Sequence, residues 1–260
     1  MKRIYPIMVL ALLFFSCAKT TMENPLYQGL FEEVSVKETI PFKSGSIEFS
    51  LTLIDVRSKG PLQKLVRQLL YGNIPPGDYA RNSIAKAKSG YEEFLASNGD
   101  TESASSHWSY EETHRVDITA HYAVLSETAY SFTGGAHGNY YSLARVIDLD
   151  TVEHLGPASL FDKPGLDALV ARELRRVSRE RTGEELSPDA PLSSGIYFED
   201  RIPASGNFFP DNAGINFQWS PYQIAPYVWG QIAILIPWTD AAKLLSPKGR
   251  ALMEAYTTAN

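Results

Sequence analysis

The sequence predicts an α+β protein with two lobes, in which mostly antiparallel sheets pack against a few helices. Several segments alternate apolar and polar residues, which is the period-2 pattern of half-buried strands. Other segments place apolar residues three or four positions apart, as amphipathic helices do. The segments follow one another as strand, two helices and sheet, and then as hairpin, helix and sheet. This order favours mostly antiparallel pairing.

The first part of the chain predicts one strand and two helices. Residues 46–56 alternate between apolar and polar side chains and form the strand. Residues 61–70 form the first helix, because their apolar side chains make a helical stripe. Pro61 suits its first turn and Gly72 its end. The second helix is expected over residues 78–96, with an aspartate as its first residue and cap.

A long alternating segment follows a polar loop. From Tyr110 onward the even-numbered residues are mostly apolar, most clearly over 116–124, which predicts one long or bent strand. The even parity continues up to Gly134. Beyond the glycines, apolar residues alternate on odd positions over 141–149. The two runs around Gly-Gly-Ala-His-Gly therefore predict a β-hairpin.

The last part of the chain predicts one long helix and a second set of strands. Residues 161–183 carry an amphipathic stripe that ends in glycine, which is typical of a helix stop. A loop with Pro and Ser follows at 184–195, and short strands broken by Pro and Gly occupy 196–219. Residues 231–236 read as a buried strand, and helical turns are expected over 239–256.

The first 16 residues have the features of a signal peptide. Lys2 and Arg3 precede an apolar run at 7–15 that is too short to span a membrane comfortably. The only cysteine, Cys17, follows directly, and Leu-Phe-Phe-Ser-Cys resembles a relaxed lipobox of bacterial lipoproteins. The sequence thus predicts an exported protein, lipidated at Cys17 and held on a membrane surface of the bacterial cell envelope. The alternative is a plain signal peptide next to an incidental Cys17.

The net charge bears on the class of partner. Loss of the signal peptide, which holds two basic residues and no acidic one, would change the formal charge from −6 to −8. A mildly acidic exported protein is a poor candidate for binding nucleic acid. A cationic partner suits it better, because opposite fields speed encounter. The alternative is that the surplus acid only keeps the protein soluble.

No recognised catalytic or metal-binding motif occurs in the sequence. GxSxG, HExxH and GxxxxGK are all absent. His107, His114 and His121 are spaced by seven, but on a strand this spacing turns successive histidines to opposite sides. His114 falls on the apolar parity and is expected to be a hydrogen-bonded core histidine, whereas His121 is expected on the solvent face. We therefore expect no metal, no cofactor and no catalytic residue.

Two further segments have unusual composition. The predicted helix at 164–182 carries five arginines, which could hold an anionic glycan or lipid. Interleaved Glu173 and Glu180 favour a structural role, as does the fit of cations to the C-terminal end of a helix dipole. Residues 218–230 contain two Trp, two Tyr and two Pro. Such loops suit recognition of sugars or proteins, and the alternative is a buried crossover that covers a sheet edge.

Two segments resemble the paired signatures of a known family. The first is Thr133-Gly134-Gly135-Ala136-His137-Gly138-Asn139, which follows an alternating strand and resembles a TGGAH signature. The second is 222–230, which resembles a Tyr-x-Ile-Ala-Pro-Tyr segment closed by Gly. Residues 126–260 thus resemble the C-terminal extracytoplasmic domain of the anti-sigma factor RsiV. Residues 36–125 resemble the companion domain that also occurs in the peptidoglycan deacetylase PdaC, and 17–35 would form a lipid-anchored tether.

The resemblance implies a non-enzymatic binding or sensing lipoprotein. RsiV binds lysozyme and so senses attack on the cell wall, and the ligand here would be a lysozyme-like protein or a peptidoglycan-type glycan. The sequence shows neither the membrane helix and sigma-binding segment of RsiV nor the catalytic domain of PdaC, so neither of those activities is expected. The candidate ligand-binding residues come from the two signatures: Thr133, Gly134, Gly135, Ala136, His137, Asn139, Tyr222, Pro226 and Tyr227.

Two alternatives from other functional classes remain open at this point. One is an envelope hydrolase that uses His137 or His114 as a general base, which would need a partner to orient the imidazole. The other is a structural lipoprotein that assembles with other envelope proteins. We expect His137 first to fix its loop by hydrogen-bonding to neighbouring backbone, second to contribute to a recognition surface, and only third to act in catalysis.

Overall fold

The computed structural model describes residues 29–42, 45–98, 107–162 and 164–258. The predicted signal peptide, Cys17 and most of the predicted tether lie outside the described residues, as does most of the predicted polar loop before the long alternating segment. Within the described part of the chain, no helix is both long and apolar enough to cross a membrane. The structure is α+β with mostly antiparallel sheets, as the sequence predicts.

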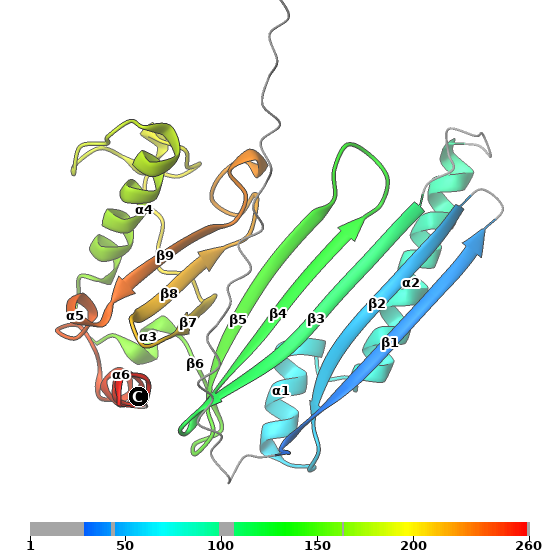
Figure 1. Cartoon of the computed structure of the whole chain (residues 1–260), viewed down its shortest axis with the longest axis horizontal. Helices are drawn as coiled ribbons and strands as arrows, with labels where there is room; N and C mark the ends of the chain where they lie inside the picture. The colour runs from blue at the N-terminus through cyan, green and yellow to red at the C-terminus, as the bar shows by residue number, and fades with distance from the viewer. Residues whose placement is uncertain (1–28, 43–44, 99–106, 163, 259–260) are drawn as a thin grey trace, which may run out of the picture.

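A six-stranded sheet with the strands in chain order forms the centre of the fold (Figure 1). Neighbouring strands are antiparallel except β2 and β3, which are parallel because two helices connect them. The strands are β1 (Phe31–Phe42), β2 (Gly45–Val56), β3 (His107–Thr119), β4 (Tyr122–Phe132), β5 (Asn139–Asp148) and β6 (Glu153–Leu155).

Helices α1 (Pro61–Tyr71) and α2 (Pro76–Asn98) cover one face of this sheet, which we call the helix face. The first predicted helix is confirmed to within one residue, and Gly72 ends it in the left-handed conformation, at φ 63°. α2 starts slightly earlier than predicted, so that Asp78 lies in its first turn. The side chains that these helices bury against the sheet include Ile47, Phe49, Leu51, Leu53, Val66, Leu70, Tyr91 and Trp108.

The prediction of one long strand through residues 110–134 is wrong. The structure has two strands, β3 and β4, joined by a turn at Ala120 and His121, with Ala120 at φ 50°. Val116 of β3 and Val124 of β4 have the same parity, yet the register places them on opposite faces. Both positions are apolar because the second lobe covers the far face of β4, so the alternation continues through the turn without a break.

The predicted tether also ends too late, because β1 begins at Phe31. β1 is an edge strand that pairs only with β2 among the described strands. Its apolar side chains, such as Val34 and Val36, alternate with polar or charged ones because one of its faces is open to solvent. The composition at the start of β1 therefore resembles that of a tether, although the backbone of β1 is paired to β2 along its length.

The C-terminal lobe contains a second, three-stranded antiparallel sheet between β5 and helix α4. The predicted helix at 161–183 begins later than expected, at Leu166, and ends as expected at Gly183 with φ 77°. The elements are α3 (Pro157–Leu160), α4 (Leu166–Thr182), β7 (Phe208–Pro210), β8 (Gly214–Trp219), β9 (Ile232–Pro237), α5 (Trp238–Ala241), α6 (Pro247–Thr257) and the 3-10 turns η3 (Leu192–Ser194) and η4 (Tyr227–Trp229).

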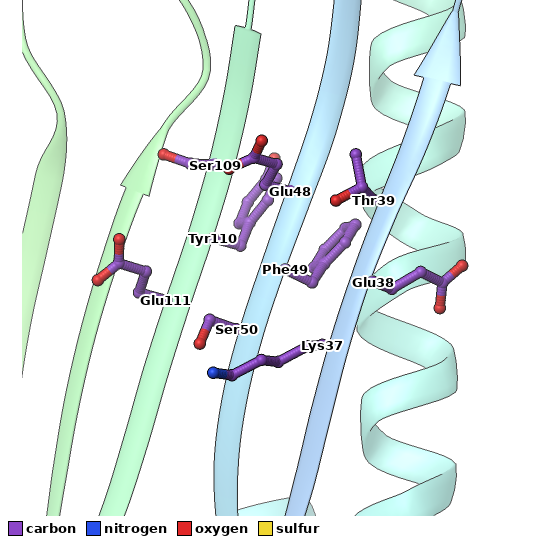
Figure 2. Close-up of a pocket in the computed structure, with 9 residues that line it drawn as sticks. All are labelled: Lys37, Glu38, Thr39, Glu48, Phe49, Ser50, Ser109, Tyr110 and Glu111. Carbon is purple, nitrogen blue, oxygen red and sulfur yellow. The ribbon is translucent and has the colours of Figure 1, made fainter.

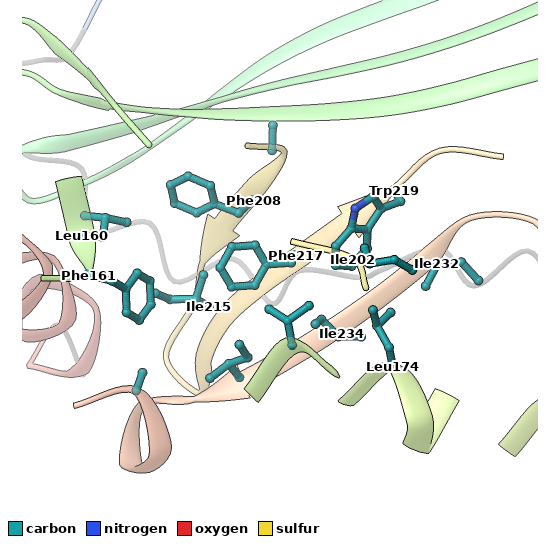
Figure 3. Close-up of a cluster of buried hydrophobic side chains, with 14 of the residues drawn as sticks. Leu160, Phe161, Leu174, Ile202, Phe208, Ile215, Phe217, Trp219, Ile232 and Ile234 are labelled. Carbon is teal, nitrogen blue, oxygen red and sulfur yellow. The ribbon is translucent and has the colours of Figure 1, made fainter. Parts of the chain in front are cut away.

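The core of this lobe extends onto the large sheet. Figure 3 shows the aromatic and branched side chains that fill it, among them Phe208, Phe217 and Trp219. Val124 of β4 and Val146 of β5 belong to the same buried cluster. The two lobes thus share the central sheet, and the boundary predicted between residues 125 and 126 lies within β4.

A buried asparagine joins the two sheets at the edge of β5. β6 pairs only with residues 146–148, which leaves the preceding part of this edge without a strand partner in the described chain. The amide oxygen of Asn207 accepts a hydrogen bond from the backbone N–H of Ala144 at 2.7 Å, and its amide nitrogen donates to the carbonyl oxygen of Ser142 at 2.7 Å. Gln218 donates to the same Asn207 oxygen at 2.9 Å, so Asn207 links two backbone groups of β5 to the small sheet.

We predict that Asn207→Ala lowers the free energy of unfolding by about 2–4 kcal/mol, because it leaves several buried polar groups without partners. Chemical denaturation checks this value. Asn212→Ala is the matched control, since Asn212 is exposed, and it should change stability by less than about 0.5 kcal/mol. Equal stability of the two variants would show that the bonds of Asn207 do not hold the sheets together.

Candidate functional site

The two signature loops, which are far apart in the sequence, lie together in the structure. The first connects β4 to β5 and the second connects β8 to β9. The Tyr227 hydroxyl donates a hydrogen bond to the Gly138 carbonyl oxygen at 2.7 Å, and the His137 ring stacks on the Tyr227 ring with centroids 4.1 Å apart. We call Tyr130, His137, Tyr140, Tyr222 and Tyr227 the aromatic cluster.

Tyr227 is at the centre of this cluster. Its ring meets Tyr140 edge-on at 6.2 Å and Tyr222 in a tilted arrangement at 5.4 Å. Burial raises the pKa of the Tyr227 hydroxyl, with smaller contributions from the neighbouring tyrosines, so it stays a donor to Gly138 at neutral pH. The contacts of Tyr227 with His137, Gly138 and Tyr140 join the second loop to β5 and to the loop that precedes it, and the contact with Tyr222 lies within the second loop.

Glycine is required where the first loop crosses Tyr130. A Cβ atom on Gly138 would lie 2.5 Å from the Cζ atom of Tyr130, far inside van der Waals contact. Gly134 and Gly135 adopt φ 82° and 114°, which L side chains rarely adopt, and they let the loop turn as the sequence predicts. These backbone constraints fix the path of the loop that carries His137.

The cluster presents exposed apolar surface in a strained backbone. Tyr222 is 58% exposed and adopts φ 66°, a left-handed conformation that is uncommon for a bulky residue. Tyr130 is 39% exposed, and nearby Val228 is 82% exposed. Strain of this kind collects at binding and catalytic sites, so the backbone at Tyr222 singles out this surface.

His137 has the loop-fixing geometry that the sequence predicts. Its Nδ1 atom lies 2.9 Å from the Gly138 carbonyl oxygen and therefore donates to it, while its ring packs on Tyr227. Within the described chain, no carboxylate contacts the imidazole. The ring is thus held by Gly138 and Tyr227, and no carboxylate among the described residues orients it as a general base would require.

The predicted site residues differ in their relation to the aromatic cluster. His137, Tyr222 and Tyr227 belong to it, and Pro226 precedes the 3-10 turn that carries Tyr227. Thr133 and Ala136 are exposed in the first loop, and Asn139 begins β5. Sequence reasoning missed Tyr130 and Tyr140. The sequence does place a tyrosine on each of the two strands that flank the glycine turn. Only the strand register shows that these two tyrosines are direct neighbours.

The two loops of the cluster carry no formal charge of their own. Residues 133–139 and 220–231 contain no Asp, Glu, Lys or Arg. Arg181 of α4 donates to the carbonyl oxygens of Trp229 and Gln231, so its guanidinium fastens the second loop to α4. The cluster therefore offers ring faces together with neutral amide and hydroxyl groups.

The other arginines of α4 are also engaged, which agrees with the structural role favoured from the sequence. Arg172 pairs with Asp240 at 2.5 Å, and Arg176 pairs with Glu173 and Glu180. The remaining partners are Ala190 O for Arg175 and Glu185 for Arg179. These bonds fasten α4 to its surroundings and leave little free basic surface on the helix.

A second polar cluster lies under α1 and α2, on the helix face of the large sheet. Glu112, His114 and Glu127 place their ligand-type atoms within 4.8 Å of one another. The Nε2 atom of His114 lies 2.7 Å from Glu112, and its Nδ1 atom lies 2.9 Å from the hydroxyl of Tyr71. His114 is thus the hydrogen-bonded core histidine that the parity predicts.

Carboxylates and imidazole are common metal ligands, but here the protein itself already provides partners. Tyr79 donates to both oxygens of Glu112 at 3.1 Å. Tyr141 and Arg145 donate to the two oxygens of Glu127 at 2.7 and 3.1 Å. An ion would have to displace these bonds, so the cluster is best described as a structural network. Sequence reasoning missed it because the pairing of His114 with Glu127 depends on the hairpin turn.

The tyrosines of this network are held in the neutral form. Burial raises the pKa of Tyr71, Tyr79 and Tyr141 above the ordinary value of 10, and the neighbouring carboxylates add to the effect. Below pH 10 both the folded and the unfolded states keep these hydroxyls protonated, so their stabilisation is fully present. Above pH 10 the unfolded chain ionises first, and the stability is lost as pH rises.

Comparisons with known proteins identify a family domain in part of the chain. Residues 159–239 match the family described as "Protein of unknown function (DUF3298)", so the chain carries a DUF3298 domain. The matched region contains the second loop of the cluster, whereas the first loop precedes it. No curated protein matches the chain.

Two crystal structures of DUF3298 family proteins are similar to this structure. The protein from Bacteroides fragilis has a TM-score of 0.68 at 18% identity, over 86% of this chain and 97% of that one. The protein from Pseudomonas aeruginosa has a TM-score of 0.51 at 13% identity, over 84% of this chain and 94% of that one. At these identities the likeness shows a shared fold and nothing about function.

We predict that His114→Ala lowers the free energy of unfolding by about 3 kcal/mol or more, because it leaves the buried Glu112 carboxylate without its imidazole partner. His121→Ala is the control, since the ion pair of His121 with Asp150 is exposed and is worth about 0–1 kcal/mol. Urea denaturation at pH 7 measures both values. Similar losses in the two variants would contradict the importance of the buried network.

We also predict that Gly138→Ala displaces the first loop, because the added Cβ collides with the ring of Tyr130. The expected cost is about 1–3 kcal/mol, as for other overpacked sites. Gly206→Ala has open space around it and should be nearly neutral. Proton NMR of the tyrosine rings reports the displacement, and unchanged Tyr130 and Tyr227 resonances in Gly138→Ala would refute it.

Proposed function

We propose that this chain is a non-enzymatic binding module of the bacterial cell envelope, with the aromatic cluster as its binding surface. The proposal rests on one observation: two loops that are far apart in the sequence contact each other at Tyr227. Their contacts hold the exposed Tyr222 ring beside His137 and Tyr227, in a backbone conformation that costs energy. A rigid exposed aromatic surface of this kind suits recognition, because little entropy is lost when a ligand packs on it.

A neutral glycan of the peptidoglycan type is the ligand that best suits this surface. Sugar rings present C–H groups that pack on aromatic faces and hydroxyls that bond to amides. The cluster offers the rings of Tyr222 and Tyr227, and the neighbouring Gln223 and Asn139 are exposed. The absence of formal charge from the two loops favours a neutral ligand at this position.

A lysozyme-like protein is the second candidate. Two observations favour it, namely the net negative charge of the chain and the highly exposed Val228 beside the cluster. The RsiV-like character of the C-terminal part and the PdaC-like character of the N-terminal part belong to this proposal, as do the signal peptide and lipidation at Cys17. Together they would place the binding surface outside the cell, on a lipid anchor.

The other functional classes have less support from the geometry. A hydrolase that uses His137 would need an orienting acid, and the contacts of this imidazole within the described residues are with Gly138 and Tyr227. A structural lipoprotein would need a partner surface, and co-purification from membranes would reveal such a partner.

We predict that the purified protein binds an N-acetylglucosamine tetrasaccharide and that Tyr222→Ala weakens this binding about tenfold or more, which corresponds to about 1.4 kcal/mol. Isothermal titration calorimetry measures the affinity. Tyr222→Phe is the matched control, since it keeps the ring and should bind nearly as well as the wild type. Tyr222 is exposed, so both variants should fold normally.

The same titration with lysozyme separates the two ligands. Binding of lysozyme alone, weakened by added salt, would favour the second candidate. If neither ligand binds, or if Tyr222→Ala binds both as well as the wild type, the aromatic cluster is not the binding surface.

A further inference from the structure

The large sheet has one face that is only partly covered. α1 and α2 pack on the helix face, and the C-terminal lobe packs on the opposite face over β4 and β5. Around Lys37, Ser50 and Glu111, no described element packs on this opposite face, which we call the open face. Lys37 and Glu111 are exposed there, and Ser50 lies half-buried between them.

A hollow of about 430 Å³ lies on the open face (Figure 2). Phe49 and Tyr110 contribute to its floor through their backbone, because their side chains stack on each other at the helix face, with centroids 5.2 Å apart. Six side chains from three neighbouring strands surround the floor: Lys37, Thr39, Glu48, Ser50, Ser109 and Glu111.

The strand register connects this hollow to the aromatic cluster. Lys37 pairs with Ser50, Ser50 with Glu111, Glu111 with Tyr130, and Tyr130 with Tyr140. Directly paired residues share a face, so these five side chains form one row across the sheet from β1 to β5. With strands about 4.8 Å apart, the row is about 19 Å long, which is enough for several sugar units in an extended chain.

The neighbouring row on the open face is made of short hydroxyl side chains: Ser35, Thr52, Thr113, Thr128 and Ser142. A protein partner would require an apolar centre rich in aromatic or branched side chains, and these two rows have aromatic rings only at their β4–β5 end. Hydroxyls beside Lys37, Glu48 and Glu111 match the alternating donors and acceptors of a sugar chain.

We infer that the open face binds an extended glycan chain, which runs from the aromatic cluster along the row of Lys37, Ser50 and Glu111 into the hollow. This inference rests on the proposed function, because the aromatic cluster anchors one end of the chain. The Glu111 carboxylate accepts from sugar hydroxyls, and the Lys37 ammonium donates to hydroxyl or acetyl oxygens. The ligand class is thereby narrowed to a linear polysaccharide of several units, as opposed to a mono- or disaccharide.

The test is the dependence of affinity on chain length. Calorimetric titration of the full chain with N-acetylglucosamine oligomers of two to six units should show affinity rising about tenfold from the shortest to the longest. In the double variant Lys37→Ala/Glu111→Ala, the disaccharide should bind as to the wild type, and the gain with length should be lost. Lys64→Ala/Glu92→Ala, exposed on α1 and α2, is the charge-matched control and should keep the gain.

Each outcome bears on the inference in a distinct way. If the disaccharide binds and longer oligomers bind no more tightly, the open face is not part of the site, while the proposed function stands. A gain with length that survives in Lys37→Ala/Glu111→Ala overturns the inference in the same way. If no oligomer of any length binds, both the inference and the glycan form of the proposed function fail.

Discussion

The edge of β5 that β6 leaves without a strand partner in the described chain determines how the C-terminal lobe is attached to the large sheet. A buried strand edge must find partners for its backbone groups, and β6 is too short to provide them beyond its three pairs with β5. The side-chain amide of Asn207 provides two of them, to Ala144 and Ser142, and Gln218 secures that amide from β8. The small sheet is thereby held beside β5, and the apolar core closes over the far faces of β4 and β5.

The aromatic cluster is a consequence of this junction. Once β8 and β9 are held beside β5, the loop between them lies next to the loop between β4 and β5. Tyr227 and Gly138 then bond, and Gln231 donates from its backbone to the hydroxyl of Tyr140 at 3.2 Å. Tyr222 lies in the same loop, between these contacts and Ser220, which bonds to Ser142, and it stays exposed in its left-handed conformation. The contacts that hold the small sheet beside β5 therefore also form the candidate binding surface.

Particular residues show what the sequence could and could not predict. Pro61 and Gly72 bracket α1, and Gly183 ends α4, because these residues act through local backbone geometry. Ala120 ends β3 at a turn that alternation alone does not reveal, since both faces of β4 are buried by different lobes. The His114 network and the row through Glu111 depend on cross-strand register, which emerges only when the hairpins are known.

If the aromatic cluster is the binding surface, a bound oligomer must contact its rings. The most direct measurement is a crystal structure of the protein with a bound N-acetylglucosamine oligomer. We expect a sugar ring stacked on Tyr222 or Tyr227 and further units along the open face of the sheet. An oligomer bound elsewhere, such as in the hollow of about 610 Å³ between α4 and residues 189–203, would contradict it.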